Sequence, residues 1–223
     1  MTTFLLAFTA LFSIVNPLSS AFIFFGATHD LGPRTRAQLS RWVAIYAFAI
    51  IAASLYVGGY VLSFFGVSLP VLKVAGGIVV AMSGWRMLTG PDTTEERRSA
   101  TTSALPITVM PSRLAFYPLT MPLTAGPGTI SVAISIGANR PTHLGAELAF
   151  FAQTLLAVVL LGLLIYLCYR HCERLARAIG PTGTAIVVRL TAFLLFCIGI
   201  QVLWTGAAQL LGTLTFGVSL PSG

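Results

Sequence analysis

Six apolar stretches of about 20 residues limit what this chain of 223 residues can fold into more than any other feature. Each stretch is long enough, as an α-helix rising about 1.5 Å per residue, to cross a hydrocarbon core of roughly 30 Å. Charged residues make up only 9% of the chain, whereas soluble domains carry roughly 25%. The sequence therefore predicts an all-α integral membrane protein, whose six transmembrane helices cover residues 4–27, 42–65, 69–88, 113–138, 146–169 and 190–211.

The basic residues predict how these helices are oriented, because lysine and arginine are retained on the cytoplasmic side of a membrane protein. With the N-terminus outside, only Lys73 and Arg140 remain outside. The other eleven basic residues then lie on the cytoplasmic side: Arg34, Arg36, Arg41, Arg86, Arg97, Arg98, Arg113, Arg170, Arg174, Arg177 and Arg189. Both termini are therefore expected outside. The net charge of +7 does not indicate a nucleic-acid partner, because the basic residues lie in short connections and form no patch interleaved with aromatic residues.

A polar connection at residues 90–112 divides the chain into two halves. Its mixed charge is typical of a flexible linker, and we expect it in the cytoplasm. Three predicted helices precede it in residues 1–89, and three follow it in residues 113–223. An odd number of helices per half makes the second half enter the membrane from the opposite side. The sequence therefore predicts two inverted three-helix repeats.

Proline and glycine interrupt the first and the fourth stretch at similar depths. Asn16 and Pro17 lie near the centre of the first stretch, about 20 Å along a helix from its start. Gly126, Pro127 and Gly128 interrupt the fourth stretch. Because proline removes a backbone N–H and glycine favours unwinding, each of these helices is predicted to be broken into two half-helices. Asn16 and Gly126 are the expected N-caps of the second half-helices, with the prolines as first helical residues.

Two matched breaks predict a polar cavity within the membrane, because an unsatisfied backbone group in hydrocarbon costs several kcal/mol. Free N–H groups after each proline, about residues 18–20 and 128–130, are expected to face this cavity and attract a carboxylate. The alternative is that the prolines only kink packed helices and that nearby hydroxyls bond to carbonyls of their own helix. We favour a binding site because the breaks are symmetric. Its candidate substrate-binding residues are Ser13, Asn16, Pro17, Ser19, Ser20, Thr124, Gly126, Pro127, Gly128, Thr129 and Gln201.

Gln201 has two interpretations of equal weight. It lies centrally in the sixth stretch, where it can line the cavity or form a hydrogen bond between helices.

Catalytic and metal chemistry find little support in the sequence. A membrane-buried nucleophile would need a histidine or lysine base, but the three histidines lie in connections or at helix ends. Cys168, His171, Cys172 and Glu173 are close in sequence, yet no second cluster completes a tetrahedral site. No catalytic residue, metal or cofactor is therefore expected. A coupling ion, Na⁺ or H⁺, stays open, because carbonyls freed at a break can hold sodium without a carboxylate.

Four segments together form a recognisable pattern: Asn16-Pro17-Leu18 in the first stretch, residues 65–77 leading into the third, residues 115–128 in the fourth, and Arg189-Leu190 with Gly199-Ile200-Gln201 in the sixth. In these segments the chain resembles the MarC family of bacterial inner-membrane proteins, and the resemblance covers nearly the whole chain. This chain departs from many relatives at Ser19 and Ala192, where they carry glycine.

The resemblance implies six helices, a multi-pass location in the bacterial inner membrane and transport of small neutral amino acids such as alanine, glycine or serine. With the charge distribution, it places both termini in the periplasm. Together with the broken helices, it favours a secondary transporter that works by alternating access. The alternative is a channel or a non-transporting membrane protein, because broken helices also build pores. The lipid bilayer and a small-molecule substrate are the expected partners, and a homo-oligomer is left open.

Overall fold

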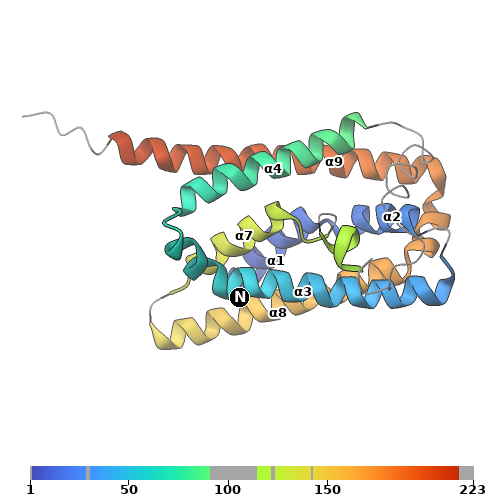
Figure 1. The fold of residues 1–223 in the computed structure, drawn as a ribbon, viewed down its shortest axis with the longest axis horizontal. Helices are drawn as coiled ribbons and strands as arrows, with labels where there is room; N and C mark the ends of the chain where they lie inside the picture. Colours follow the sequence, from blue (N-terminus) through green and yellow to red (C-terminus); the bar gives the residue numbers. More distant parts are fainter. Residues whose placement is uncertain (1, 29–30, 91–114, 122–123, 142, 216–223) are drawn as a thin grey trace, which may run out of the picture.

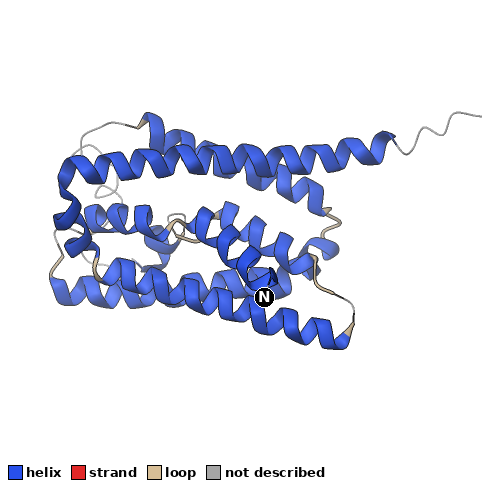
Figure 2. Ribbon diagram, turned by 180° about the vertical axis from the view of Figure 1, so that it is seen from behind, coloured by secondary structure: helices blue, strands red, loops and turns tan. Residues whose placement is uncertain are grey.

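The computed structural model describes residues 2–28, 31–90, 115–121, 124–141 and 143–215. Every regular element within these ranges is helical, as Figure 2 shows. The first half of the chain contributes α1 (Thr2–Val15), α2 (Pro17–Ala27), α3 (Pro33–Phe64) and α4 (Leu69–Thr89). The second half contributes the π-helix η1 (Ala115–Thr120), α7 (Pro127–Ala138), α8 (Leu144–Arg170) and α9 (Cys172–Thr215). The predicted all-α class is confirmed for the described part of the chain.

Among the described residues, five helical segments are long and apolar enough to cross a membrane: Thr2–Ala27, Pro33–Phe64, Leu69–Thr89, Gly145–Arg170 and Thr182–Gly212. They support the predicted multi-pass membrane protein. The fourth predicted stretch, residues 113–138, contains η1 and α7, and its residues 113–114 and 122–123 lie outside the described ranges. At 12 residues, or roughly 18 Å, α7 alone does not span a core of roughly 30 Å. The count of six spans therefore stays a prediction.

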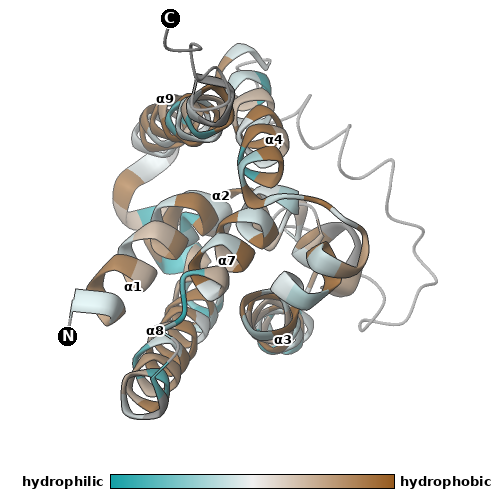
Figure 3. Cartoon of the chain, turned by 90° about the vertical axis from the view of Figure 1, so that its left-hand side faces the viewer, coloured by the Kyte–Doolittle hydropathy of each residue, from teal (hydrophilic) through white to brown (hydrophobic). Residues whose placement is uncertain are grey.

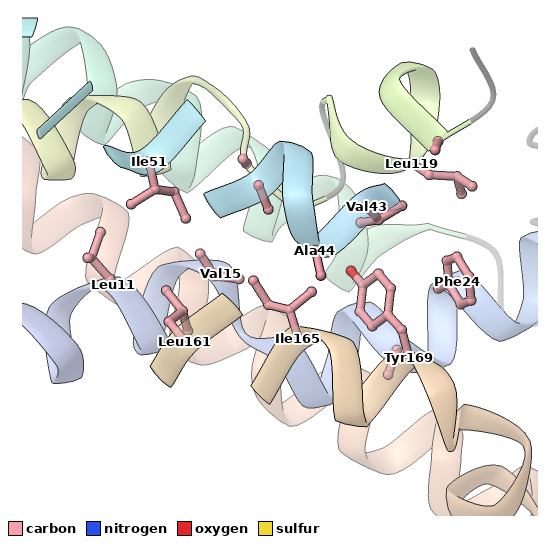
Figure 4. Close-up of a cluster of buried hydrophobic side chains, with 14 of the residues drawn as sticks. Leu11, Val15, Phe24, Val43, Ala44, Ile51, Leu119, Leu161, Ile165 and Tyr169 are labelled. Carbon is pink, nitrogen blue, oxygen red and sulfur yellow. The ribbon is translucent and has the colours of Figure 1, made fainter. Parts of the chain in front are cut away.

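The helices form three layers, which can be followed in Figures 1 and 3. One outer layer consists of α4 and α9, which lie side by side and make the most extensive helix contact in the described chain. The opposite outer layer contains α3 and α8, and α1, α2 and α7 lie between. Buried side chains such as Leu11, Val43, Leu119 and Ile165 fill the space around α3 and α8 (Figure 4). Both predicted breaks belong to the middle layer, so protein flanks them on two sides.

Glycines bring the backbones of α4 and α9 into direct contact. A Cβ added to Gly84 would lie 2.5 Å from the backbone nitrogen of Phe196, and one added to Gly206 would lie 2.7 Å from the carbonyl oxygen of Pro70. Gly77 approaches the backbone of α9 in the same way. These contacts pair the start of α4 with the end of α9, so the two helices run antiparallel. Small residues at the interface are a general means of close helix packing in membranes.

Two helices begin earlier than the sequence indicated. α3 begins at Pro33 rather than at residue 42, because Gly32 serves as its N-cap and proline suits the first helical position. α9 begins at Cys172 rather than at residue 190 and changes direction at Gly180, whose φ is 75° and ψ is 171°. The predicted limits followed apolar residues, whereas these helices continue through polar segments where charged side chains can reach water. The predicted linker, residues 90–112, lies outside the described residues except for its first residue.

Candidate functional site

Asn16 forms the first break through a left-handed backbone conformation, with φ 44° and ψ 67°. Asparagine adopts this conformation more readily than most residues, and Asn16 is the only non-glycine residue of the described chain with a positive φ. Its side-chain oxygen accepts a hydrogen bond from the Ser19 N–H at 3.4 Å, and Pro17 opens α2. The predicted N-cap and first helical residue are therefore confirmed at the first break.

Gly126 forms the second break with an extended backbone, φ −76° and ψ 177°, and Pro127 opens α7. The predicted cap position is confirmed, although no side chain caps this half-helix. The chain before the break forms the π-helix η1, which the sequence did not predict. The hydroxyl of Thr124 donates a hydrogen bond to the carbonyl of Leu119 at 2.8 Å. This bond satisfies a carbonyl in the distorted segment, as a membrane environment requires.

Fewer backbone N–H groups are free at the breaks than the sequence indicated. The N–H of Ser19 bonds to the Asn16 side chain, and that of Ser20 donates to the Asn16 carbonyl at 3.0 Å. The N–H of Ile130 donates to the Gly126 carbonyl at 3.1 Å. The expectation of three free amides after each proline is therefore wrong for these three residues, because each half-helix starts its own hydrogen bonding at once. The backbone N–H groups still expected to be free are those of Leu18, Gly128 and Thr129.

Tyr169 of α8 joins the two breaks. Its hydroxyl lies 2.7 Å from the hydroxyl of Thr124, beside the second break. The hydroxyl of Ser20, beside the first break, lies near the same phenol. The side chain is fully buried, and its ring stacks on Phe24 with the centroids 4.6 Å apart (Figure 4). Residues from α2, α8 and the segment before α7 therefore meet at one phenol.

The Tyr169 hydroxyl has one proton to share between the two breaks. The Ser20 hydroxyl donates to the carbonyl of Val15 at 2.9 Å, and the Thr124 hydroxyl donates to that of Leu119 at 2.8 Å. The Thr124 hydroxyl can then accept the single proton of the phenol, and the nearby Ser20 hydroxyl is a second acceptor that could compete for it. The three hydroxyls form a buried polar network that can favour either break.

Sequence reasoning missed Tyr169, because a tyrosine near the end of an apolar stretch is typical of the membrane interface. The helical spacing contained a usable signal. Tyr169 follows Leu161 and Ile165 at intervals of four residues, so the three lie on one face of α8. All three are buried. An apolar face that ends in a phenol indicates a buried hydroxyl, which needs a partner from another helix.

The remaining predicted site residues divide between the breaks and other surroundings. Ser19 is buried and accepts a hydrogen bond from the hydroxyl of Thr191 in α9 at 2.8 Å. Thr129 is buried just after the second break, and Ser13 is half-buried on α1, just before the first. The structure does not bring Gln201 to the breaks. Its side chain is exposed, on the face of α9 turned away from α4.

Gly128, the second residue of α7, packs directly against Val80 of α4, whose side chain occupies the place of a Cβ. Gly76 of α4 meets Ser131 of α7 in the same way. The Ser131 hydroxyl also donates to the carbonyl of Leu72 at 3.0 Å. The second break therefore rests on α4 through close contacts at Gly128 and Gly76, whereas the hydroxyl of Thr191 connects the first break to α9.

Side chains close the two ends of the helix bundle to different degrees. At the end where α3 begins, Arg36 forms an ion pair with Glu173 of α9 at 2.9 Å and donates to the carbonyl of Thr28 at 3.1 Å. At the opposite end, a cavity of about 420 Å³ lies between the ends of α3 and α7. Arg140 lines this cavity, with its guanidinium 4.9 Å from the ring centroid of Tyr60. One end is held together by an ion pair whose arginine is buried, and the other is hollow.

The cluster of Cys168, His171, Cys172 and Glu173 lies at the end of the bundle that holds the Arg36–Glu173 ion pair. Its carboxylate, Glu173, bonds to Arg36, and no three His, Cys, Asp or Glu residues of the described chain are placed to hold a metal ion. Burial raises the pKa of Cys172 to about 11, so its thiol stays protonated at neutral pH.

Known proteins resemble this chain over almost its full length. A model of the MarC family of integral membrane proteins matches residues 1–211. The inner membrane protein MarC of Salmonella paratyphi A is 32% identical over 211 residues, which cover 93% of this chain and 95% of the relative. That of Escherichia coli is 31% identical over 210 residues, with the same coverage. No solved structure matches the chain. The chain therefore belongs to the MarC family, and it is a multi-pass protein of the inner membrane.

Proposed function

We propose that this chain is a secondary transporter of small solutes, small neutral amino acids in particular, and that it works by alternating access. One observation carries the proposal: the buried phenol of Tyr169 hydrogen-bonds Thr124 beside one helix break and lies near Ser20 beside the other. Transporters place their solute sites at discontinuous helices, because unwound backbone supplies dipoles for charged groups. In this proposal the chain has no catalytic centre and no cofactor.

A zwitterionic solute fits the chemistry of the breaks. Its carboxylate would lie near the amides that follow Pro17 or Pro127, at the positive ends of the half-helices. Its ammonium group would lie near the carbonyls before the breaks, with Asn16 and Thr124 as side-chain partners. A bound solute would also compete for the single Tyr169 proton. Solute binding would then weaken the hydrogen bond between Tyr169 and Thr124.

The helix contacts support two inverted repeats, residues 1–89 and 113–223. Pairing Pro17 with Pro127 makes α2 equivalent to α7 and α1 equivalent to η1, and the equivalent helices α3 and α8, and α4 and α9, contact each other. The contact of α3 with α7 has its counterpart in that of α8 with α2, and the contact of α4 with α7 has its counterpart in that of α9 with α2. The contact of α3 with η1 likewise corresponds to that of α8 with α1. The antiparallel course of α4 and α9 is what an axis in the membrane plane would produce.

The unequal ends of the bundle support one state of an alternating cycle. Under the charge rule, the end that Arg36 closes is cytoplasmic, and the end with the 420 Å³ cavity is periplasmic, as are both termini. Rocking one repeat against the other would break the Arg36–Glu173 pair and open the cytoplasmic end. Uptake driven by a Na⁺ gradient or by an H⁺ gradient identifies the coupling ion.

Uptake and counterflow in proteoliposomes, across a panel of small amino acids, test this function. We expect saturable uptake and counterflow, with Tyr169→Phe changing transport and Tyr166→Phe, one turn earlier on the same helix, leaving it unchanged. Asn16→Ala should weaken apparent affinity by about 1–2 kcal/mol, or roughly five- to thirty-fold. Flux that neither saturates nor shows counterflow would make the chain a channel. Absence of flux for every solute, ion gradient and orientation tested would overturn the transport function.

A further inference from the structure

Gln201 places a carboxamide on the lipid-facing surface of the membrane span. The span of α9 covers Thr182–Gly212, and Gln201 lies about 6 Å from its centre, well inside a hydrocarbon half-thickness of roughly 15 Å. Its side chain is exposed and makes no hydrogen bond to any other described residue. Lipid tails offer no hydrogen bond, and an amide left unpaired in an apolar medium costs several kcal/mol. This position calls for a polar partner outside the chain.

The residues around Gln201 form a regular stripe. The stripe consists of six exposed residues: Leu190, Leu194, Cys197, Gln201, Trp204 and Ala208. The intervals between them alternate between four and three residues, so the pattern repeats every seven residues. Apolar residues at this spacing form the contact seam of two left-handed supercoiled helices, and a single polar residue in the seam fixes the pairing. The stripe extends over about 27 Å of helix, nearly the thickness of the hydrocarbon core.

We propose that a second copy of this chain covers the stripe, α9 against α9, with the two Gln201 carboxamides hydrogen-bonded to each other. A carboxamide carries both a donor and an acceptor, so Gln201 is complementary to itself. Two copies inserted in the same direction are related by a two-fold axis along the membrane normal, which makes the paired helices parallel. In a parallel pair, equivalent residues of the seam face one another, so the amides meet at the same depth.

The fold leaves this face of α9 available. The glycines of α4 take up the opposite face, and α4 and α9 together form an outer layer of the bundle (Figures 1 and 3). A partner of different sequence could also satisfy one amide. The self-complementary amide and the regular seam favour a second copy, and the experiments below separate the two.

Cys197 provides a direct test, because the three cysteines differ in accessibility. Cys197 is exposed on the stripe, Cys168 is half-buried and Cys172 is buried. The full chain carrying Cys168→Ser and Cys172→Ser is oxidised in membranes by oxygen with copper phenanthroline. Each disulfide then forms from two Cys197 thiols, and the oxidant takes up two electrons and two protons. We expect a covalent dimer of twice the chain mass.

A matched control moves the thiol to another lipid-facing helix. With Cys197→Ser also present, Leu156→Cys places an exposed thiol on α8, at the far side of the bundle. We expect no dimer from this variant. Absence of a Cys197 dimer, or equal dimer from both variants, would overturn the proposal. Cross-linking only to other proteins would show a different partner and would overturn it as well.

The amide is tested by measuring dimerisation of two fluorescently labelled pools in bilayers. Gln201→Leu keeps the seam apolar but removes the hydrogen bond, and should weaken dimerisation about three- to thirty-fold. Gln201→Asn keeps an amide and should lose less. Circular dichroism and the melting temperature show whether each variant is folded. A folded Gln201→Leu variant that associates as tightly as the parent would contradict the role of Gln201.

Discussion

The two helix breaks occupy matching places in the sequence but are made in different ways. The first depends on Asn16, which combines a left-handed backbone with a side-chain cap. The second has an extended backbone at Gly126 that any residue can adopt. It depends instead on the small size of Gly128, which packs against Val80. A chain can therefore interrupt a membrane helix through local conformation or through close packing. The two mechanisms predict different responses to the same kind of substitution.

The largest difference is expected at the second residue of each half-helix. Gly128→Val should lower the free energy of unfolding by about 3 kcal/mol, because the new side chain overlaps Val80. Leu18→Val occupies the equivalent place after Pro17, where the side chain is 38% exposed, and should cost less than about 1 kcal/mol. Equilibrium unfolding in mixed micelles measures both values. Equal losses would show that the two breaks are made in the same way.

At the cap residues, substitution should destabilise the first break more than the second, and the loss of unfolding free energy should be smaller than at Gly128. Asn16→Ala should cost about 2 kcal/mol, because alanine loses the cap and is strained at φ 44°. Gly126→Ala should cost about 0.5 kcal/mol or less, because alanine adopts φ −76° and ψ 177° without strain. Asn16→Gly separates the two causes, since glycine restores the backbone but not the cap. The same unfolding assay applies, and a Gly126→Ala loss as large as that of Asn16→Ala would remove the distinction.

The smallest effect concerns the phenol that the breaks share. Double-mutant cycles that pair Tyr169→Phe with Ser20→Ala or with Thr124→Val should give coupling energies of about 0.5–1 kcal/mol each. Because one proton serves both acceptors, the Tyr169–Thr124 coupling should increase when Ser20 is already alanine. Melting temperatures of the single, double and triple variants supply the values. Coupling that stays constant would mean that Ser20 does not compete with Thr124 for the proton of the phenol.

The sequence predicted the helical class and the places of both breaks, because proline and glycine act on the backbone where they stand. Asn16 and Gly126 could be assigned as caps for this reason. The sequence could not show which residues of distant helices would hydrogen-bond to each other. The bonds of Tyr169 to Thr124 and of Thr191 to Ser19 depend on how helices cross, which no local pattern encodes. The early start of α9 also escaped prediction, since apolar length does not show where a helix ends outside hydrocarbon.

Gly84 and Gly180 give opposite rules for what sequence change the fold can accept. At Gly84 the backbone is helical but the adjacent chain leaves no room, so only the smallest side chains would be retained over evolution. At Gly180 the surroundings are open, yet φ is +75°, so asparagine is a more acceptable substitute than alanine. Variation at the first position would report how closely α4 and α9 approach in related proteins. Variation at the position of Gly180 would report whether the helix equivalent to α9 still bends in those proteins.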